Sequence, residues 1–167
     1  MTIAESFAEN AEIHPIDIVE TVASHYEWDF DRVAEDQIAM TLEGQWRSYA
    51  ITLAWSPSDE TLRLICTFEL EPPEERMVVL YELLNKMNDL CWAGAFTWWG
   101  EEKLIVFRYG LVLAGDQVAT TEQVDTMIHA AVMSAERFYP AIQLALWDNR
   151  TAKGAMQAAI AEAYGRA

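Results

Sequence analysis

The chain has little of what most reaction chemistry requires. It contains three histidines, two cysteines and seven glycines. No histidine lies at a zinc-ligand spacing from another histidine or a cysteine, and the patterns CxxC, HExxH, GxSxG, GxxxxGK[ST] and GxGxxG do not occur. The sequence therefore offers no zinc site, nucleophile elbow or phosphate-binding loop. We predict a non-catalytic protein with no cofactor and no bound metal.

Positive charge is also scarce. Eleven Lys and Arg residues stand against 27 Asp and Glu residues, which gives a net charge of −16. Up to Gln45 there are eleven acids and a single base, Arg32. Such a chain repels phosphate backbones, which argues against non-specific nucleic-acid binding. The acidity either keeps the protein soluble or attracts a basic protein partner, and the sequence leaves both interpretations open.

Long hydrophobic runs are missing as well. No run reaches the roughly 18 apolar residues of a membrane span, and the first residues, MTIAESFAENAEIHP, lack the basic and apolar regions of a secretion signal. We therefore expect a cytoplasmic protein with reduced cysteines. Because 52% of the residues are hydrophobic, we expect one packed domain over residues 14–149. A flexible N-terminus (1–13) precedes it, and an Ala-rich C-terminal helix (150–167) follows.

Hydrophobic periodicity predicts an α+β fold. Alternation with period two predicts an antiparallel meander of three strands and a later hairpin, over residues 34–44, 46–55, 61–70, 95–99 and 103–113. Helical spacing predicts three helices, over residues 15–26, from 74 to 92 and from 121 onward, with Pro140 kinking or restarting the last one. The order αβββαββα plus a C-terminal helix predicts an antiparallel sheet with helices mainly on one face.

A family resemblance rests on five segments, which are LRLICTFEL, PPEER, LLNKMND, WWGEEKLIVFRYGLVL and VDTMIHAAVMSAERFYPAIQ. Together they resemble the YbjN family of bacterial sensory transduction regulators, over about Ile16 to Ala145. The resemblance implies a fold similar to that of type III secretion chaperones, which are small, acidic and usually dimeric and hold a client segment. It also implies a regulatory or adaptor role in a bacterial stress or signalling response, without catalysis, and a homodimer.

The tryptophans are the strongest indication of a binding surface. Trp98 and Trp99 are adjacent on a predicted strand, so their side chains point to opposite faces and only one joins the core. Trp46 is out of phase with the apolar residues of its own strand. We predict that Trp46 and one of Trp98 or Trp99 contact a protein partner on the open sheet face, and the acidity of the chain favours a basic one. The alternative is that the C-terminal helix covers them.

A second functional class is a small-molecule sensor. Its pocket would lie between the sheet and the helices and would be lined by Trp55, Met87 and Phe107. A metabolite that raises the melting temperature would favour this class over the protein-binding module.

Two polar features have structural and functional interpretations. An EF-hand loop that starts at Asp29 would need Gly and Glu where Ala34 and Met40 stand, so the acidic residues 29–36 predict a solvated strand edge. Asn85 and Asn88 lie three apart on a predicted helix, where Asn is unfavourable. Their side chains therefore hydrogen-bond to a neighbouring loop or contact a ligand.

Overall fold

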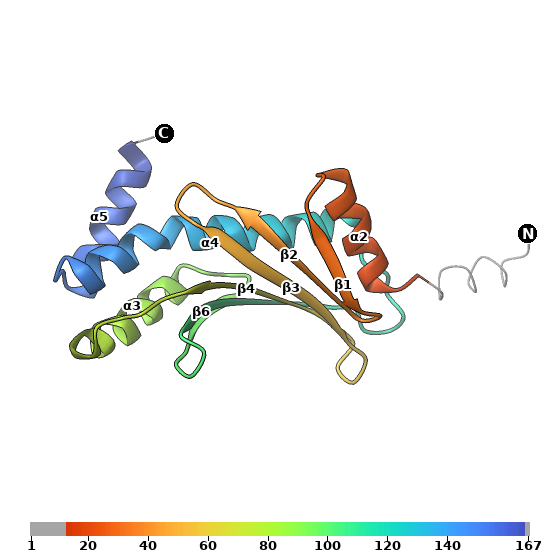
Figure 1. The fold of residues 1–167 in the computed structure, drawn as a ribbon, viewed down its shortest axis with the longest axis horizontal. Coiled ribbons are helices and arrows are strands. Elements are labelled where there is room, and N and C mark those ends of the chain that lie inside the picture. The colour runs from red at the N-terminus through yellow and green to blue at the C-terminus, as the bar shows by residue number, and fades with distance from the viewer. Residues whose placement is uncertain (1–12, 166–167) are drawn as a thin grey trace, which may run out of the picture.

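A six-stranded antiparallel sheet in the order β1-β2-β3-β4-β6-β5 organises the protein (Figure 1). The computed structural model describes residues 13–165. The strands are β1 (Phe30–Ala34), β2 (Gln37–Glu43), β3 (Ser48–Ser56), β4 (Thr61–Glu69), β5 (Ala95–Trp99) and β6 (Leu104–Val112). The helices are α2 (Pro15–His25), the 3-10 turn η1 (Glu74–Arg76), α3 (Met77–Asp89), α4 (Thr121–Trp147) and α5 (Ala152–Gly165).

The sheet buries one face because its strands alternate. In β4, Leu62, Leu64, Cys66 and Phe68 are all buried, whereas the residues between them are at least partly accessible. The register places Cys66 opposite Ile51 of β3 and Phe107 of β6. These three side chains form one layer of the core across three strands, as expected for an antiparallel sheet with one covered face.

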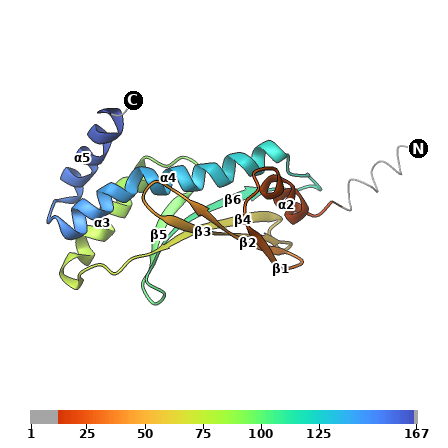
Figure 2. The same ribbon diagram turned by 45° about the horizontal axis from the view of Figure 1, so that its top comes forward.

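Helices α2 and α4 lie across that face, and α3 flanks β5 (Figures 1 and 2). Helix α4 begins at a capping box, in which the Thr120 hydroxyl accepts from the Gln123 amide and the Gln123 side chain accepts from the Thr120 amide. It continues through Pro140 to Trp147 as one helix, so the restart at Pro140 that the sequence suggested does not occur. The alanines Ala131 and Ala135 are buried, which lets α4 approach the strands closely.

Helix α5 packs against α3 and α4 near the C-terminal end of α4 (Figure 1). Its contact side is small and apolar, with Ala152, Ala155, Met156 and Ala159 buried. The Arg76 guanidinium donates to the Ala145 carbonyl at 2.9 and 2.6 Å and to the Arg150 carbonyl at 2.6 Å. Because carbonyls in the last turn of a helix lack intrahelical partners, this arginine satisfies the end of α4 where α5 begins.

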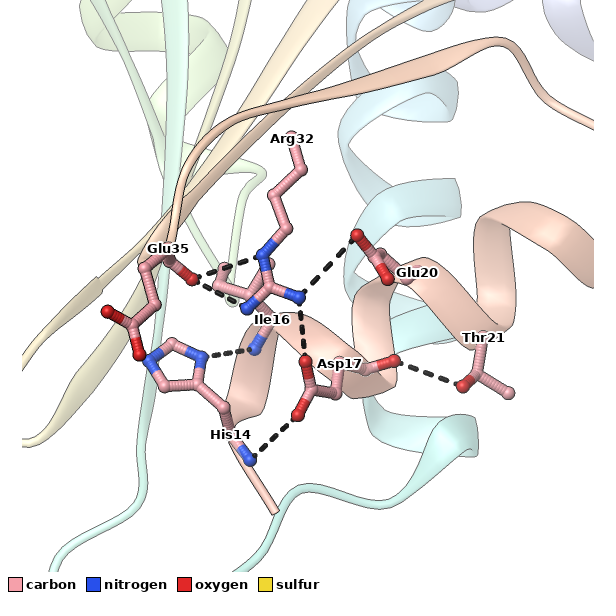
Figure 3. A network of polar contacts seen from close by, with 7 residues as sticks. All are labelled: His14, Ile16, Asp17, Glu20, Thr21, Arg32 and Glu35. Atoms are coloured by element: carbon pink, nitrogen blue, oxygen red, sulfur yellow. Dashed lines mark hydrogen bonds and ion pairs between the residues drawn. The ribbon is translucent and has the colours of Figure 1, made fainter. Parts of the chain in front are cut away.

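Arg32, the first basic residue of the chain, connects β1 to α2 through polar contacts (Figure 3). Arg32 donates to Asp17 at 2.7 Å and to the Glu35 carbonyl, and it lies 3.5 Å from Glu20. The hydrogen bond from Arg32 is the main reason that the pKa of Asp17 is lowered. Asp17 also closes a capping box with His14, whose ring nitrogen accepts from the Ile16 amide. This network fixes the start of α2 against the edge of the sheet.

Three expectations need correction. Strand β1 precedes the predicted meander, so the meander has four strands rather than three. Strand β3 begins at Ser48, which leaves Trp46 in the β2–β3 turn. Helical spacing over residues 15–26 indicated an apolar stripe of Ile18, Val22 and His25 or Tyr26, but the buried face of α2 consists of Ile16, Val19, Val22 and Ala23. The proposed flexible segment 1–13 lies outside the described residues except for Ile13, which is exposed.

Candidate protein-binding surface

The sheet face opposite α2 and α4, here called the bare face, carries no helix among residues 13–165 (Figure 2). Towards β2 and β3 it presents small side chains, including Ala39, Ala50, Thr52 and Ala54. Towards β5 and β6 it presents larger apolar ones. The composition of this face therefore changes across the sheet, and only one half offers bulky contact groups.

The apolar half is the bare-face patch, which we define as Ile65, Trp99, Leu104 and Val106. Trp99 lies directly opposite Leu104, and Val106 follows two residues later on the same side of β6. Val106 is fully buried although it does not belong to the main core. Its cross-strand neighbours on the bare face are Thr67 of β4 and Thr97 of β5, so side chains of this face cover it.

The structure separates the three tryptophans that the sequence grouped. Trp98 pairs with the buried Ile105 and packs against the core, so Trp99 is the one that faces outward. Trp46 lies on the other side of the molecule, with its ring centroid 6.5 Å from that of Tyr139 in α4. The expectation that Trp46 joins the open sheet face is wrong, because its hairpin turn bends toward α4 and its amide donates to Glu136.

Trp92 is an exposed aromatic that the sequence analysis did not select. Its side chain is 99% exposed in the loop between α3 and β5. The spacing of α3 contained the signal, since Leu80, Leu84 and Met87 continue at Cys91 and leave Trp92 off the apolar face. A fully exposed tryptophan is available as a contact group for a partner.

Asn88 has a structural role. Its side-chain amide donates to the Phe96 carbonyl at 2.9 Å, and its carbonyl oxygen accepts from the Phe96 amide at 2.6 Å. The side chain therefore replaces a neighbouring strand at the outer edge of β5. Asn88 therefore hydrogen-bonds within the chain, although its partner lies in strand β5 rather than in a loop, whereas Asn85 is exposed.

The three residues expected to line a sensor pocket do not meet. Met87 and Phe107 are almost completely buried core side chains. Phe107 of β6 shares a layer with Ile51 of β3. Trp55 lies four residues further along β3, about 13 Å from Ile51. Trp55 instead lines an open groove of about 280 Å³ with His14, Leu113 and the loop before α4.

The two thiols and Tyr49 keep their protons near neutral pH. Burial raises the pKa of the Cys66 thiol to about 12 and also raises the pKa of Cys91, so both stay protonated near neutral pH. Burial, and then the hydrogen bond to Glu136, raise the pKa of Tyr49. Within residues 13–165, no three His, Cys, Asp or Glu side chains are grouped so that they could hold a metal ion. No helix in the same range is long and apolar enough to cross a membrane.

Comparisons with known proteins agree on one family. The YbjN family model, described as "Putative bacterial sensory transduction regulator", matches residues 15–144. A solved structure titled "Crystal structure of YbjN, a putative transcription regulator from E. coli" is similar, with a TM-score of 0.52 and 12% identity over 80% of this chain and 89% of that chain. At that identity the likeness concerns the fold. No curated protein sequence matches this chain.

Proposed function

Because this chain belongs to the YbjN family, we propose that it is a non-catalytic regulatory module that binds a protein partner through the bare face. The family description supports a regulatory role at a coarse level. The observation that carries the finer proposal is the bare-face patch, where Trp99 and Leu104 pair on a sheet face that no helix of the described residues 13–165 covers.

The surroundings of the patch suit a protein contact. Glu69, Arg63 and Arg108 project from the same face and are exposed. An apolar centre with a rim of mixed charge is the usual anatomy of a protein interface, and tryptophan is among its most frequent energetic anchors. The rim would select the orientation of the partner, and the patch would supply most of the affinity.

In detail, the proposal is a cytoplasmic, chaperone-like protein or regulatory adaptor in a bacterial stress or signalling response. It functions as a homodimer, and the acidic N-terminal part steers a basic client toward it. The similarity to type III secretion chaperones, which the family resemblance implies, is the support for the homodimer. A patch that contacts its own copy also fits twofold symmetry, in which the same surface serves both subunits.

Substitution of Trp99 tests this proposal. We expect Trp99→Ala to weaken self-association in sedimentation velocity and to reduce the capture of partners from a bacterial lysate. A tryptophan at an interface centre contributes about 2 kcal/mol, which is roughly 30-fold in affinity. The matched control is Trp147→Ala, which removes a half-exposed tryptophan from the end of α4. Identical self-association and capture in the two variants would contradict the proposal.

The groove beside Trp55 favours a second function, a small-molecule sensor. It combines an aromatic side chain with polar groups, which is a common arrangement in ligand sites. Thermal-shift screening with a panel of metabolites tests it. A compound that raises the melting temperature of the wild type but not of Trp55→Ala would support the sensor, and a panel without such a compound would count against it.

A further inference from the structure

A groove of about 640 Å³ lies where the chain passes from α2 into β1. Three segments line it, namely residues 27–29, the end of β2 (Thr41–Glu43) and one side of α4 (His129, Val132 and Met133). We call it the acidic groove. Figure 1 shows the end of β2 beside α4 at this place. The groove contains none of the bare-face patch residues.

One wall of the groove is a strand edge without a neighbour. The pairing of β1 with β2 begins at Phe30 and Met40, so β1 does not reach Thr41–Glu43. On the other side, Leu42 and Glu43 pair with Tyr49 and Ser48 of β3. Backbone groups on the outer side of this short stretch therefore have no strand to pair with among the described residues. Such an edge is suited to an added extended segment.

The opposite wall is apolar and held in place. Trp28 stacks on Tyr26 with ring centroids 4.7 Å apart, and its ring lies 5.6 Å from that of His129. Asp125 holds the two rings beside Trp28. It accepts a hydrogen bond from the Tyr26 hydroxyl at 3.0 Å and lies 2.7 Å from Nδ1 of His129. Met133 is 69% exposed beside this wall. The groove thus has a preformed aromatic side and an accessible apolar one.

The charge of the groove is uncompensated. Glu27, Asp29 and Glu43 are exposed at its rim. Neither Glu27 nor Asp29 forms an ion pair within residues 13–165, and Glu43 accepts only from the Ser48 hydroxyl. The nearest base in the sequence, Arg32, is engaged with Asp17 and Glu20 instead. A cationic occupant would complete this site.

From this geometry we propose that the acidic groove binds an extended basic segment of a partner protein. The segment pairs with the outer edge of Thr41–Glu43, and its Lys or Arg side chains meet the carboxylates of Glu27, Asp29 and Glu43. An apolar side chain of the segment contacts Trp28 and Met133. This site goes beyond the proposed function, since it lies away from the bare-face patch and does not depend on it.

A synthetic peptide with alternating valine and lysine is the probe, and its valine–glutamate counterpart is the negative control. We expect the lysine peptide to shift the backbone amide signals of Thr41–Glu43 and the indole signal of Trp28 in NMR spectra. Glu27→Gln with Asp29→Asn should weaken binding by at least about tenfold, because two close charges are lost. The matched control, Asp31→Asn with Asp36→Asn, removes the same charge outside the groove and should retain affinity.

A second pair of variants tests the location independently of the acids. Met133→Lys places a cation in the groove and should abolish peptide binding, whereas Val78→Lys adds the same charge at an exposed position on α3 and should not. If each groove variant and its matched control lose the same amount of peptide affinity, the attraction is diffuse and electrostatic, and the proposal is overturned. The proposal is also overturned if spermine, a polycation without a peptide backbone, binds the protein and loses its binding in Met133→Lys to the same extent. The Trp99→Ala protein should bind the peptide normally, so failure of the bare-face proposal and failure of this one can be distinguished.

Discussion

Glu136 provides the sharpest test of how the hairpin and helix are joined. From α4, its carboxylate accepts hydrogen bonds from the Tyr49 hydroxyl at 2.5 Å, the Gln45 amide at 2.8 Å and the Trp46 amide at 3.2 Å. Tyr49 is fully buried. A Cβ atom at Gly44 would lie 2.3 Å from Glu136 Oε1, so the turn approaches this carboxylate closely and requires glycine there. The β2–β3 turn is therefore anchored to α4 through one side chain.

The magnitude follows from these contacts. Glu136→Ala leaves the buried Tyr49 hydroxyl without an acceptor, which costs about 1–3 kcal/mol, whereas the two exposed turn amides regain water and cost about 0.5 kcal/mol each. We therefore expect the free energy of unfolding to fall by about 2–4 kcal/mol, or the melting temperature by roughly 4–16 °C. Tyr49→Phe removes the hydroxyl but leaves the amide bonds intact, so it should cost only about 1 kcal/mol.

Urea denaturation followed by circular dichroism measures both variants and their double mutant. Glu82→Ala is the control, since Glu82 is an exposed acid on α3 and should change stability by less than about 0.5 kcal/mol. The two substitutions should be strongly non-additive, because the double mutant has no buried hydroxyl to strand. A loss for Glu136→Ala no larger than that for Tyr49→Phe would refute the reasoning.

The same site predicts an alkaline effect. Burial and the Glu136 hydrogen bond raise the pKa of Tyr49 above its ordinary value of 10.0. Only the unfolded tyrosine then ionises near that value, so the stability that Tyr49 contributes is present below pH 10 and is lost as the pH rises further. Tyr49→Phe should show a smaller loss of unfolding free energy above pH 10. Parallel pH profiles for wild type and variant would contradict this assignment.

Three further predictions concern other elements. Asn88→Asp removes the donor to the Phe96 carbonyl, so unfolding free energy should fall by about 1–3 kcal/mol and hydrogen exchange at β5 should accelerate; unchanged exchange would count against the edge contact. The pKa of Asp17 is lowered below 3.8 mainly by its bond to Arg32, so this contribution is present above pH 3.8 and is lost as the pH falls through the lowered pKa. Arg32→Ala should therefore destabilise the protein at neutral pH more than at pH 3 in urea titrations, and an equal effect at both would argue against the pairing. Trp92→Ala should change unfolding free energy by less than about 0.5 kcal/mol, because the side chain is 99% exposed; a larger loss would show that the tryptophan packs.

The strands and helices that alternate or repeat clearly were predictable. In β4, every second residue from Leu62 to Phe68 is apolar, and the structure buries all of them. Strand β1, in contrast, was not recognisable, because FDRVA has no alternation and is mostly exposed. It is a strand because the turn at Glu35 and Asp36 folds it back onto β2, which is a pairing that no pattern within the segment encodes.

The candidate surface was predictable only in part, because some of its features follow from neighbouring residues and others from distant ones. Adjacency alone dictates that Trp98 and Trp99 face opposite sides of a strand. Which side α4 covers depends on contacts between residues far apart in the sequence, such as Phe96 with Phe138. The position of Trp46 was not predictable, since the carboxylate that holds its amide, Glu136, is 90 residues away. The acidic groove likewise joins residues 27–29 to α4.

Local periodicity, composition and charge thus determined from the sequence alone that the protein has an α+β fold with an acidic N-terminal part and few groups for catalysis. The tertiary structure decided which sheet face stays bare, where β1 stops short of the end of β2, and which tryptophans remain accessible. The physical reason is range. Alternation and helical spacing act between residues a few positions apart, whereas the cover of a sheet face and the closure of a groove depend on the packing of elements separated by most of the chain.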